Sequence, residues 1–165
     1  MTVRNSKLIY LHGLEGTSQG VKATLLRGIF PGILTPDLRG SLEERMTSLH
    51  AILGEQVGWT IFGSSFGGLL AAMFACQQPW QVDRLVLLAP ALIWPDFASA
   101  LPEAVDVPTL VFHGSRDEII PLAMVRPLAE RVFRVLDFRV VDDDHGLYQT
   151  MHEIDWLALI GRSAG

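Results

Sequence analysis

The stretch Trp59-Thr60-Ile61-Phe62-Gly63-Ser64-Ser65-Phe66-Gly67 decides the fold of this chain. Its apolar beginning predicts a buried strand, and the apolar segment 66–77 predicts a helix directly behind it. Between them, a G-x-S-x-G pattern puts Ser65 on a very sharp turn, where the residues two before and two after it approach closely. Gly63 and Gly67 are small enough for that approach. We therefore expect Ser65 to be exposed at a helix N-terminus, whose dipole favours developing negative charge.

Outward from this turn, short apolar runs alternate with segments of helical periodicity. Strands are expected at 8–11, 33–35, 59–62, 85–89, 108–112 and 138–141. Helices are expected at 20–30, 41–57, 66–77, 122–132 and 146–160. The alternation predicts an α/β fold, a three-layer α/β/α sandwich with a mostly parallel six-stranded sheet, in a single domain spanning residues 1–165.

The composition narrows the class of function. The chain has 165 residues, of which 49% are hydrophobic and 19% charged, as in a folded globular domain. Its net charge of −5 disfavours binding to nucleic acid, which needs a basic surface. The single cysteine, Cys76, excludes an internal disulfide and a multi-cysteine metal site. Phosphate-binding glycine motifs are also missing, so no metal and no cofactor are expected.

Two observations bear on location. The start, Met1–Lys7, is not followed by the apolar segment of a secretory signal. The most apolar runs, 69–76 and 85–94, are too short to span a bilayer. We therefore expect a cytoplasmic protein without a membrane span, and its oligomeric state stays unknown.

A serine hydroxyl attacks poorly until a base takes its proton. Ligand sites in parallel sheets form beyond the carboxyl ends of the strands, and His145 follows the last expected strand. From that position its imidazole can extend over the edge of the sheet toward Ser65. Ser65 is the serine of the turn that has a glycine two residues before it and two residues after it. Ser64 is the rival nucleophile. The other candidate bases are His12, His50, His113 and His152.

The base in turn needs an acid that fixes its tautomer and stabilises the imidazolium. Asp117 is the candidate, because it follows the strand at 108–112. Its rivals are Glu118 and the run Asp142-Asp143-Asp144. A run of three aspartates is more typical of a solvated loop, and Asp144 is too near His145 in sequence to reach under its ring easily.

The order serine, aspartate, histidine at the ends of the third, fifth and sixth strands resembles the alpha/beta-hydrolase superfamily. The segment 113–121 looks like its acid loop, H-G-x-x-D-x-x-x-P, and Thr35–Gly40 looks like its P-D-x-R-G segment. The superfamily's usual first two strands are missing, and the segment 90–107 is too short for a cap domain. The resemblance is therefore to a minimal fold, that of the small cap-less serine esterases.

This resemblance implies hydrolysis of carboxylic esters or thioesters of small to medium acyl substrates, through an acyl-enzyme on Ser65. It implies an oxyanion hole made by the backbone N–H groups of Phe66 and of Leu14 or Glu15, with Leu14 preferred. The expected substrate pocket includes His12, Leu92 and Trp94, and Ile93, Phe97 and Leu101 could line it too. The alternative for these apolar residues is that they only cover the edge of the sheet. The alternatives are a non-catalytic, receptor-like small-molecule binding protein, or a peptidase or lyase on the same fold.

Overall fold

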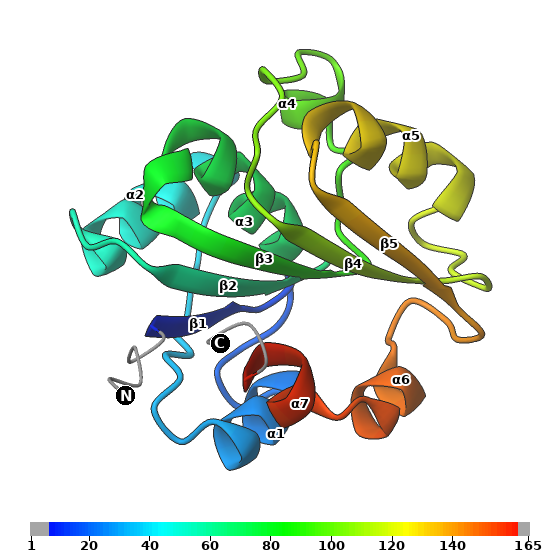
Figure 1. Ribbon diagram of the computed structural model, residues 1–165, viewed down its shortest axis with the longest axis horizontal. Helices are drawn as coiled ribbons and strands as arrows, with labels where there is room; N and C mark the ends of the chain where they lie inside the picture. The colour runs from blue at the N-terminus through cyan, green and yellow to red at the C-terminus, as the bar shows by residue number, and fades with distance from the viewer. Residues whose placement is uncertain (1–6, 162–165) are drawn as a thin grey trace.

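In the computed structural model, which describes residues 7–161, a parallel sheet lies between two layers of helices (Figure 1). The five strands are β1 (Lys7–Leu11), β2 (Trp59–Ser64), β3 (Val82–Leu88), β4 (Thr109–Gly114) and β5 (Leu136–Val141). They pair in sequence order, and every pair is parallel. The carboxyl ends of all strands therefore meet at one edge, which confirms the predicted α/β fold class.

The helices divide between the two faces of the sheet (Figure 1). On one face lie α2 (Leu42–Leu53), α3 (Phe66–Gln77), α4 (Pro95–Ala98) and α5 (Leu122–Val132), and on the other lie α1 (Val21–Ile29), α6 (Tyr148–Glu153) and α7 (Trp156–Gly161). A short 3₁₀ turn, η1 (Pro79–Gln81), precedes β3. Each face buries its own apolar cluster, and Trp156 packs edge-on against Phe62 and Phe112 on the second face.

The sheet has five strands and not the predicted six. The expected strand at 33–35 is reduced to a single bridge, in which Leu34 pairs with Ile9 at the outer edge of β1. Leu34 donates to the carbonyl of Leu8 and accepts from the amide of Tyr10. Prolines limit this segment on both sides, because Pro31 and Pro36 have no N–H to donate to a ladder.

Helix ends also differ from the prediction in two places. The capping box of Ser41 and Glu44 begins α2 as expected, but the helix ends at Leu53 because Gly54 turns the chain with a φ of 56°. The helix predicted at 146–160 is broken into α6 and α7. Ile154 is extended there, and Asp155 accepts a hydrogen bond from the amide of Ala158, which begins the second helix.

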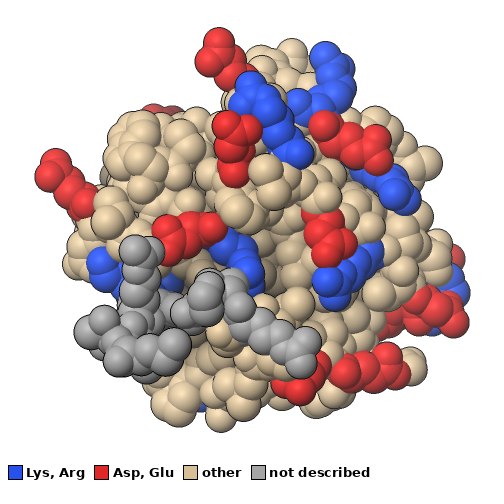
Figure 2. Space-filling model, in the orientation of Figure 1, with Lys and Arg blue, Asp and Glu red and all other residues tan. Residues whose placement is uncertain are grey.

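Acidic and basic side chains are interleaved on the face shown in Figure 2. Arginines pair with nearby carboxylates in four exposed ion pairs: Arg116–Asp142, Arg126–Glu130, Arg134–Asp106 and Arg139–Asp137. No helix within residues 7–161 has the length and apolarity needed to cross a membrane. The segment Met1–Ser6, expected to be part of a start without a secretory signal, lies outside the described residues.

Candidate functional site: a serine, histidine and aspartate relay

Ser65 occupies a strained turn between β2 and α3. Its backbone angles, φ 56° and ψ −114°, lie in a region that non-glycine residues rarely adopt. A Cβ on Gly63 would collide with the carbonyl of Gly67, and a Cβ on Gly67 would collide with the carbonyl of Leu11. A hydrogen bond from the amide of Ser65 to the carbonyl of Leu88, 2.9 Å long, helps to hold the strained residue in place. The two glycines thus let the chain hold Ser65 at the carboxyl edge of the sheet.

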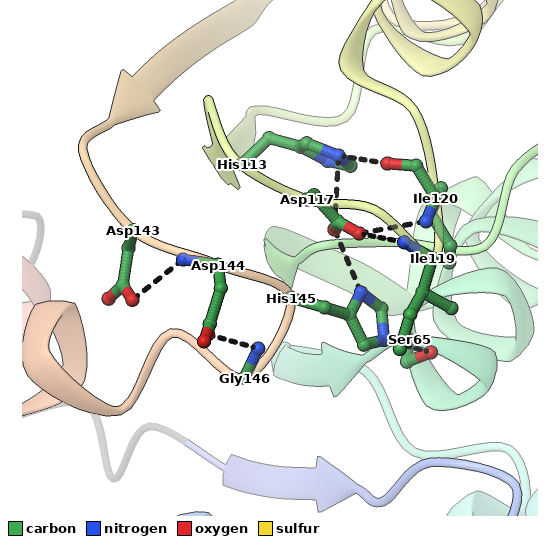
Figure 3. Close-up of polar contacts among 9 residues, drawn as sticks. All are labelled: Ser65, His113, Asp117, Ile119, Ile120, Asp143, Asp144, His145 and Gly146. Atoms are coloured by element: carbon green, nitrogen blue, oxygen red, sulfur yellow. Dashed lines mark hydrogen bonds and ion pairs between the residues drawn. The ribbon is translucent and has the colours of Figure 1, made fainter.

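The side chains of Ser65, His145 and Asp117 form a continuous relay (Figure 3). The Nε2 atom of His145 lies 3.1 Å from Ser65 Oγ, and its Nδ1 atom lies 2.8 Å from Asp117 Oδ2. Because an Nδ1–H donates to the carboxylate, Nε2 is left as the acceptor that faces the serine hydroxyl. This is the geometry that a base needs to take the hydroxyl proton.

Asp117 is buried and its second oxygen is occupied by the backbone. The side chain is 0% exposed, and Oδ1 accepts hydrogen bonds from the amides of Ile119 and Ile120 at 3.0 and 2.7 Å. His113 lies beneath it, with Nε2 at 2.8 Å from the carbonyl of Ile120 and 3.3 Å from Asp117 Oδ2. With these contacts made, Oδ2 of Asp117 faces the Nδ1 atom of His145.

A buried carboxylate also shapes the loop that carries His145. Asp143 Oδ2 accepts from the amide and hydroxyl of Thr150 at 3.0 and 2.8 Å, which ties the loop to α6. Asp144 accepts from the amide of Gly146, and Asp142 pairs with Arg116 at the surface. The rival aspartates therefore have structural contacts of their own, and among the carboxylates of the described residues only that of Asp117 bonds to His145.

The rival nucleophile Ser64 is a buried residue at the end of β2 that borders the same cavity, but the Nε2 atom of His145 bonds to Ser65 and not to Ser64. The rival bases lie in other surroundings. His50 on α2 bonds to Gln77, at the opposite end of α3 from Ser65, and His152 is exposed on α6. His113 is buried under Asp117, where burial lowers its pKa from 6.5 and keeps the ring neutral.

His12 fixes the loop that faces Ser65. Its Nε2 atom accepts from the amide of Leu38 at 2.9 Å, so the proton resides on Nδ1, which donates to the carbonyl of Gly13 at 2.7 Å. Gly13 lies against the nucleophile, since a Cβ built on it would be 3.7 Å from that of Ser65. The ring therefore holds the turn and is not within bonding distance of the serine.

Arg45 holds the same turn from α2. Its guanidinium donates to the carbonyls of Gly13, Leu14 and Gly40 and lies 5.1 Å from the ring centroid of Phe66. The side chain is almost fully buried. A sequence signal existed for it, because Arg45 interrupts the buried stripe of α2 between Leu42 and Leu49.

Leu14 and Phe66, whose backbone amides are the expected oxyanion donors, line the same cavity as Ser65. Within the described residues neither amide has a hydrogen-bond acceptor, and Phe66 is the first residue of α3. The carbonyl of the Gly13–Leu14 peptide accepts from His12, Gly16 and Arg45. In a trans peptide the N–H points the opposite way, so the Leu14 amide points away from these donors.

A cavity of about 640 Å³ opens above Ser65. His12 and Trp94 line it as predicted, and the Trp94 ring packs edge-on against Phe66 at 5.1 Å between centroids. The expectation for Leu92 is wrong. Its side chain is 0% exposed and belongs to the apolar core, as does that of Phe97, whereas Ile93 lines the cavity as predicted and Ala91 lines it as well.

Among residues 7–161, no cluster of three histidine, cysteine or acidic side chains could hold a metal ion. Cys76 is half-buried near the end of α3, and burial raises its pKa to about 12. A thiol with so high a pKa carries almost no thiolate at neutral pH.

The sequence model of the family described as Phospholipase/Carboxylesterase matches residues 45–159, a range that includes Ser65, Asp117 and His145. No curated protein matches the sequence.

Solved structures of similar fold include an esterase from Pyrococcus furiosus, with a TM-score of 0.75 and 18% identity, covering 95% of this chain and 81% of that one. Alpha/beta hydrolase domain-containing protein 10 from mouse has a TM-score of 0.74 and 17% identity, with 92% and 87% covered. A protein from Xanthomonas campestris pv. campestris assigned to the alpha/beta superfamily is 27% identical, with a TM-score of 0.73 and 89% and 91% covered.

Proposed function

The chain belongs to the phospholipase/carboxylesterase family of the alpha/beta hydrolases and is a hydrolase, and from that premise we propose that it cleaves carboxylic ester or thioester bonds through an acyl-enzyme on Ser65. The observation that carries the proposal is the unbroken relay from Ser65 Oγ through His145 to buried Asp117, at 3.1 and 2.8 Å.

The reaction follows from the roles of these groups. Ser65 Oγ attacks the carbonyl carbon while His145 Nε2 takes its proton, and Asp117 stabilises the imidazolium. The carbonyl oxygen becomes an oxyanion that the amides of Leu14 and Phe66 stabilise. Collapse expels the alcohol or thiol, which takes the proton from His145. A water activated by His145 then cleaves the acyl-enzyme and releases the acid and free Ser65.

The cavity supports small to medium acyl groups. Between β3 and β4 the chain forms only the short helix α4, so no cap domain within residues 7–161 covers Ser65. Ala91, Ile93 and Trp94 give the cavity an apolar wall. Each methylene group of the acyl chain that is buried against this wall should stabilise substrate binding by about 0.8 kcal/mol. The wall is open and does not enclose a long acyl chain.

A series of para-nitrophenyl esters from acetate to palmitate tests this proposal, with Ser65→Ala as the inactive control. We expect kcat/KM to peak among the short or medium chains and to be lost in the variant. A preference for palmitate would contradict the acyl-size proposal, and unchanged hydrolysis by Ser65→Ala would contradict the acyl-enzyme. Thioester and anilide analogues of the best acyl group test thioesterase and peptidase activity.

A further inference from the structure

The cavity above Ser65 contains a lysine that the proposed reaction does not use. Lys22 is the second residue of α1, is half-buried and lines the cavity together with Tyr148 of α6. Both helices lie on the same face of the sheet (Figure 1). The chain has one other lysine, Lys7, which lies at the amino end of β1 and donates to the carbonyl of Val57.

The ammonium of Lys22 lacks a paired anion. Its Nζ atom lies 4.7 Å from the centroid of the Tyr148 ring, and no carboxylate within residues 7–161 is at ion-pairing distance from it. Asp143 and Asp144 attract it from farther away, but both carboxylates accept hydrogen bonds from the backbone of their own loop.

Partial burial makes this unpaired charge costly. Loss of water lowers the pKa of Lys22, and the attraction of the two aspartates offsets only part of that effect. An anion that entered the cavity would restore to the ammonium the charge partner that the protein does not provide. The face of Tyr148 already restricts where the ammonium lies, so less side-chain entropy is lost on binding.

Both layers of helices contribute residues to the cavity. The wall on the side of α3 and α4 is apolar and includes Phe66, Ile93 and Trp94, whereas the wall on the side of α1 and α6 includes Lys22 and Tyr148. Glu15 also lines the cavity, but it is exposed, so water screens its charge more than that of half-buried Lys22. A substrate that fits both walls carries an apolar group and an anionic group on the same molecule.

We propose that Lys22 and Tyr148 form a subsite for an anionic oxygen group, a carboxylate or a phosphate, carried by the ester substrate. This inference rests on the proposed function and names its substrate class: amphiphilic esters whose apolar part packs against Trp94 and whose anion binds Lys22. The subsite determines specificity and takes no part in proton transfer.

Matched ester pairs test the subsite. Para-acetoxybenzoate and para-acetoxyphenyl phosphate carry the anion on the leaving group, and para-nitrophenyl hemisuccinate carries it on the acyl group. The methyl ester of each carboxylate and phenyl acetate are the neutral partners. The expected ratio of kcat/KM, anionic over neutral, is about tenfold for at least one pair, and comparison of the pairs identifies the anion and its side.

Variants assign the preference to Lys22. Lys22→Met should reduce the anionic-to-neutral ratio to near one, and Lys22→Arg should keep most of it. Lys7→Met removes the same charge far from the cavity and should leave the ratio as in the wild type. A ratio near one in the wild type, or an unchanged ratio in Lys22→Met, overturns the subsite.

A binding measurement distinguishes a failure of the subsite proposal from a failure of the proposed function. If the wild type hydrolyses no ester, the proposed function is wrong, and the subsite is then tested with Ser65→Ala alone. Calorimetry of para-acetoxybenzoate and its methyl ester should show tighter binding of the anion to Ser65→Ala and no such difference in the Ser65→Ala, Lys22→Met double variant. Equal binding of both esters to Ser65→Ala overturns the subsite independently of catalysis.

Discussion

Arg45 donates a hydrogen bond from Nη2 to the carbonyl oxygen of Leu14 over 2.9 Å, although the two residues are 31 positions apart. The same guanidinium reaches the carbonyl of Gly13 and lies over the ring of Phe66. One buried side chain on α2 therefore contacts both residues whose amides are proposed to stabilise the oxyanion. We infer that Arg45 acts on that hole as a positioning residue through these peptides, because its own side chain does not line the cavity above Ser65.

Replacement of Arg45 should therefore lower kcat more than it raises KM. Arg45→Lys keeps the charge but loses the fork that bonds several carbonyls at once, and we expect kcat to fall by roughly 10- to 100-fold. Titration of active sites with a fluorophosphonate counts the folded enzyme in each sample. If the rate per titrated site equals that of the wild type, Arg45 has a purely structural role.

Asp117→Asn should leave the fold intact and abolish most of the activity. The asparagine oxygen can still accept from the amides of Ile119 and Ile120, but its NH₂ group would donate to His145 Nδ1. That contact forces the ring proton onto Nε2, which can no longer accept from Ser65. We expect kcat to fall on the order of 10⁴-fold with an unchanged circular dichroism spectrum. Retention of a tenth of the activity would show that the base does not depend on this acid.

The buried ring of His113 should make the protein less stable in mild acid. Burial lowers its folded-state pKa below 6.5, so between the two pKa values the unfolded chain binds more protons. Its contribution to stability is therefore complete above pH 6.5 and declines as the pH falls below that value. Protonation would also create a second N–H at Nδ1, which has no partner among the described residues.

Thermal unfolding between about pH 7 and pH 5 tests this effect. The melting temperature of the wild type should fall over this range more than that of His113→Gln, which can still donate to the carbonyl of Ile120 but does not titrate. Parallel curves for the two proteins would show that His113 contributes nothing to the acid sensitivity.

Gly67→Ala should prevent the turn at Ser65 from forming. The added Cβ would collide with backbone atoms of Leu11 and His12, which cannot move without breaking β1. We expect little soluble protein and no activity. Gly28→Ala is the matched control, since nothing lies within 4 Å of the added Cβ on α1, and alanine should stabilise that helix by about 0.5–1 kcal/mol. Full activity of Gly67→Ala would contradict this account of the turn.

Much of this architecture is readable from local sequence signals. The glycines around Ser65, the apolar runs at strand positions and the capping box at Ser41 each act over a few residues, so the sequence carries them directly. The features that the sequence patterns did not predict depend on tertiary contacts or on a competing local signal. The segment at Leu34 has strand character but gains only one bridge, and Asp155 starts a new helix within a continuous helical period.

In the functional site, too, the local signals could be read from the sequence and the tertiary contacts could not. The relay of Ser65, Asp117 and His145 could be proposed from strand ends, because a parallel sheet brings its carboxyl ends to one edge. The orientation of a side chain beyond a strand is not periodic, so Leu92 was expected in the cavity although its neighbours Ala91 and Ile93 line it. Lys22 was also missed, because its surroundings depend on a tertiary contact with the ring of Tyr148, which is distant in the sequence.

The central claim is that Ser65 is the activated nucleophile, and covalent labelling tests it most directly. The wild type is treated with a fluorophosphonate and analysed by intact mass and peptide mapping, beside Ser65→Ala, His145→Ala and the neighbouring control Ser64→Ala. The account predicts one adduct, on Ser65, which persists in Ser64→Ala, is much slower in His145→Ala and is missing in Ser65→Ala. An unlabelled wild type, or an adduct that survives in Ser65→Ala, would contradict it.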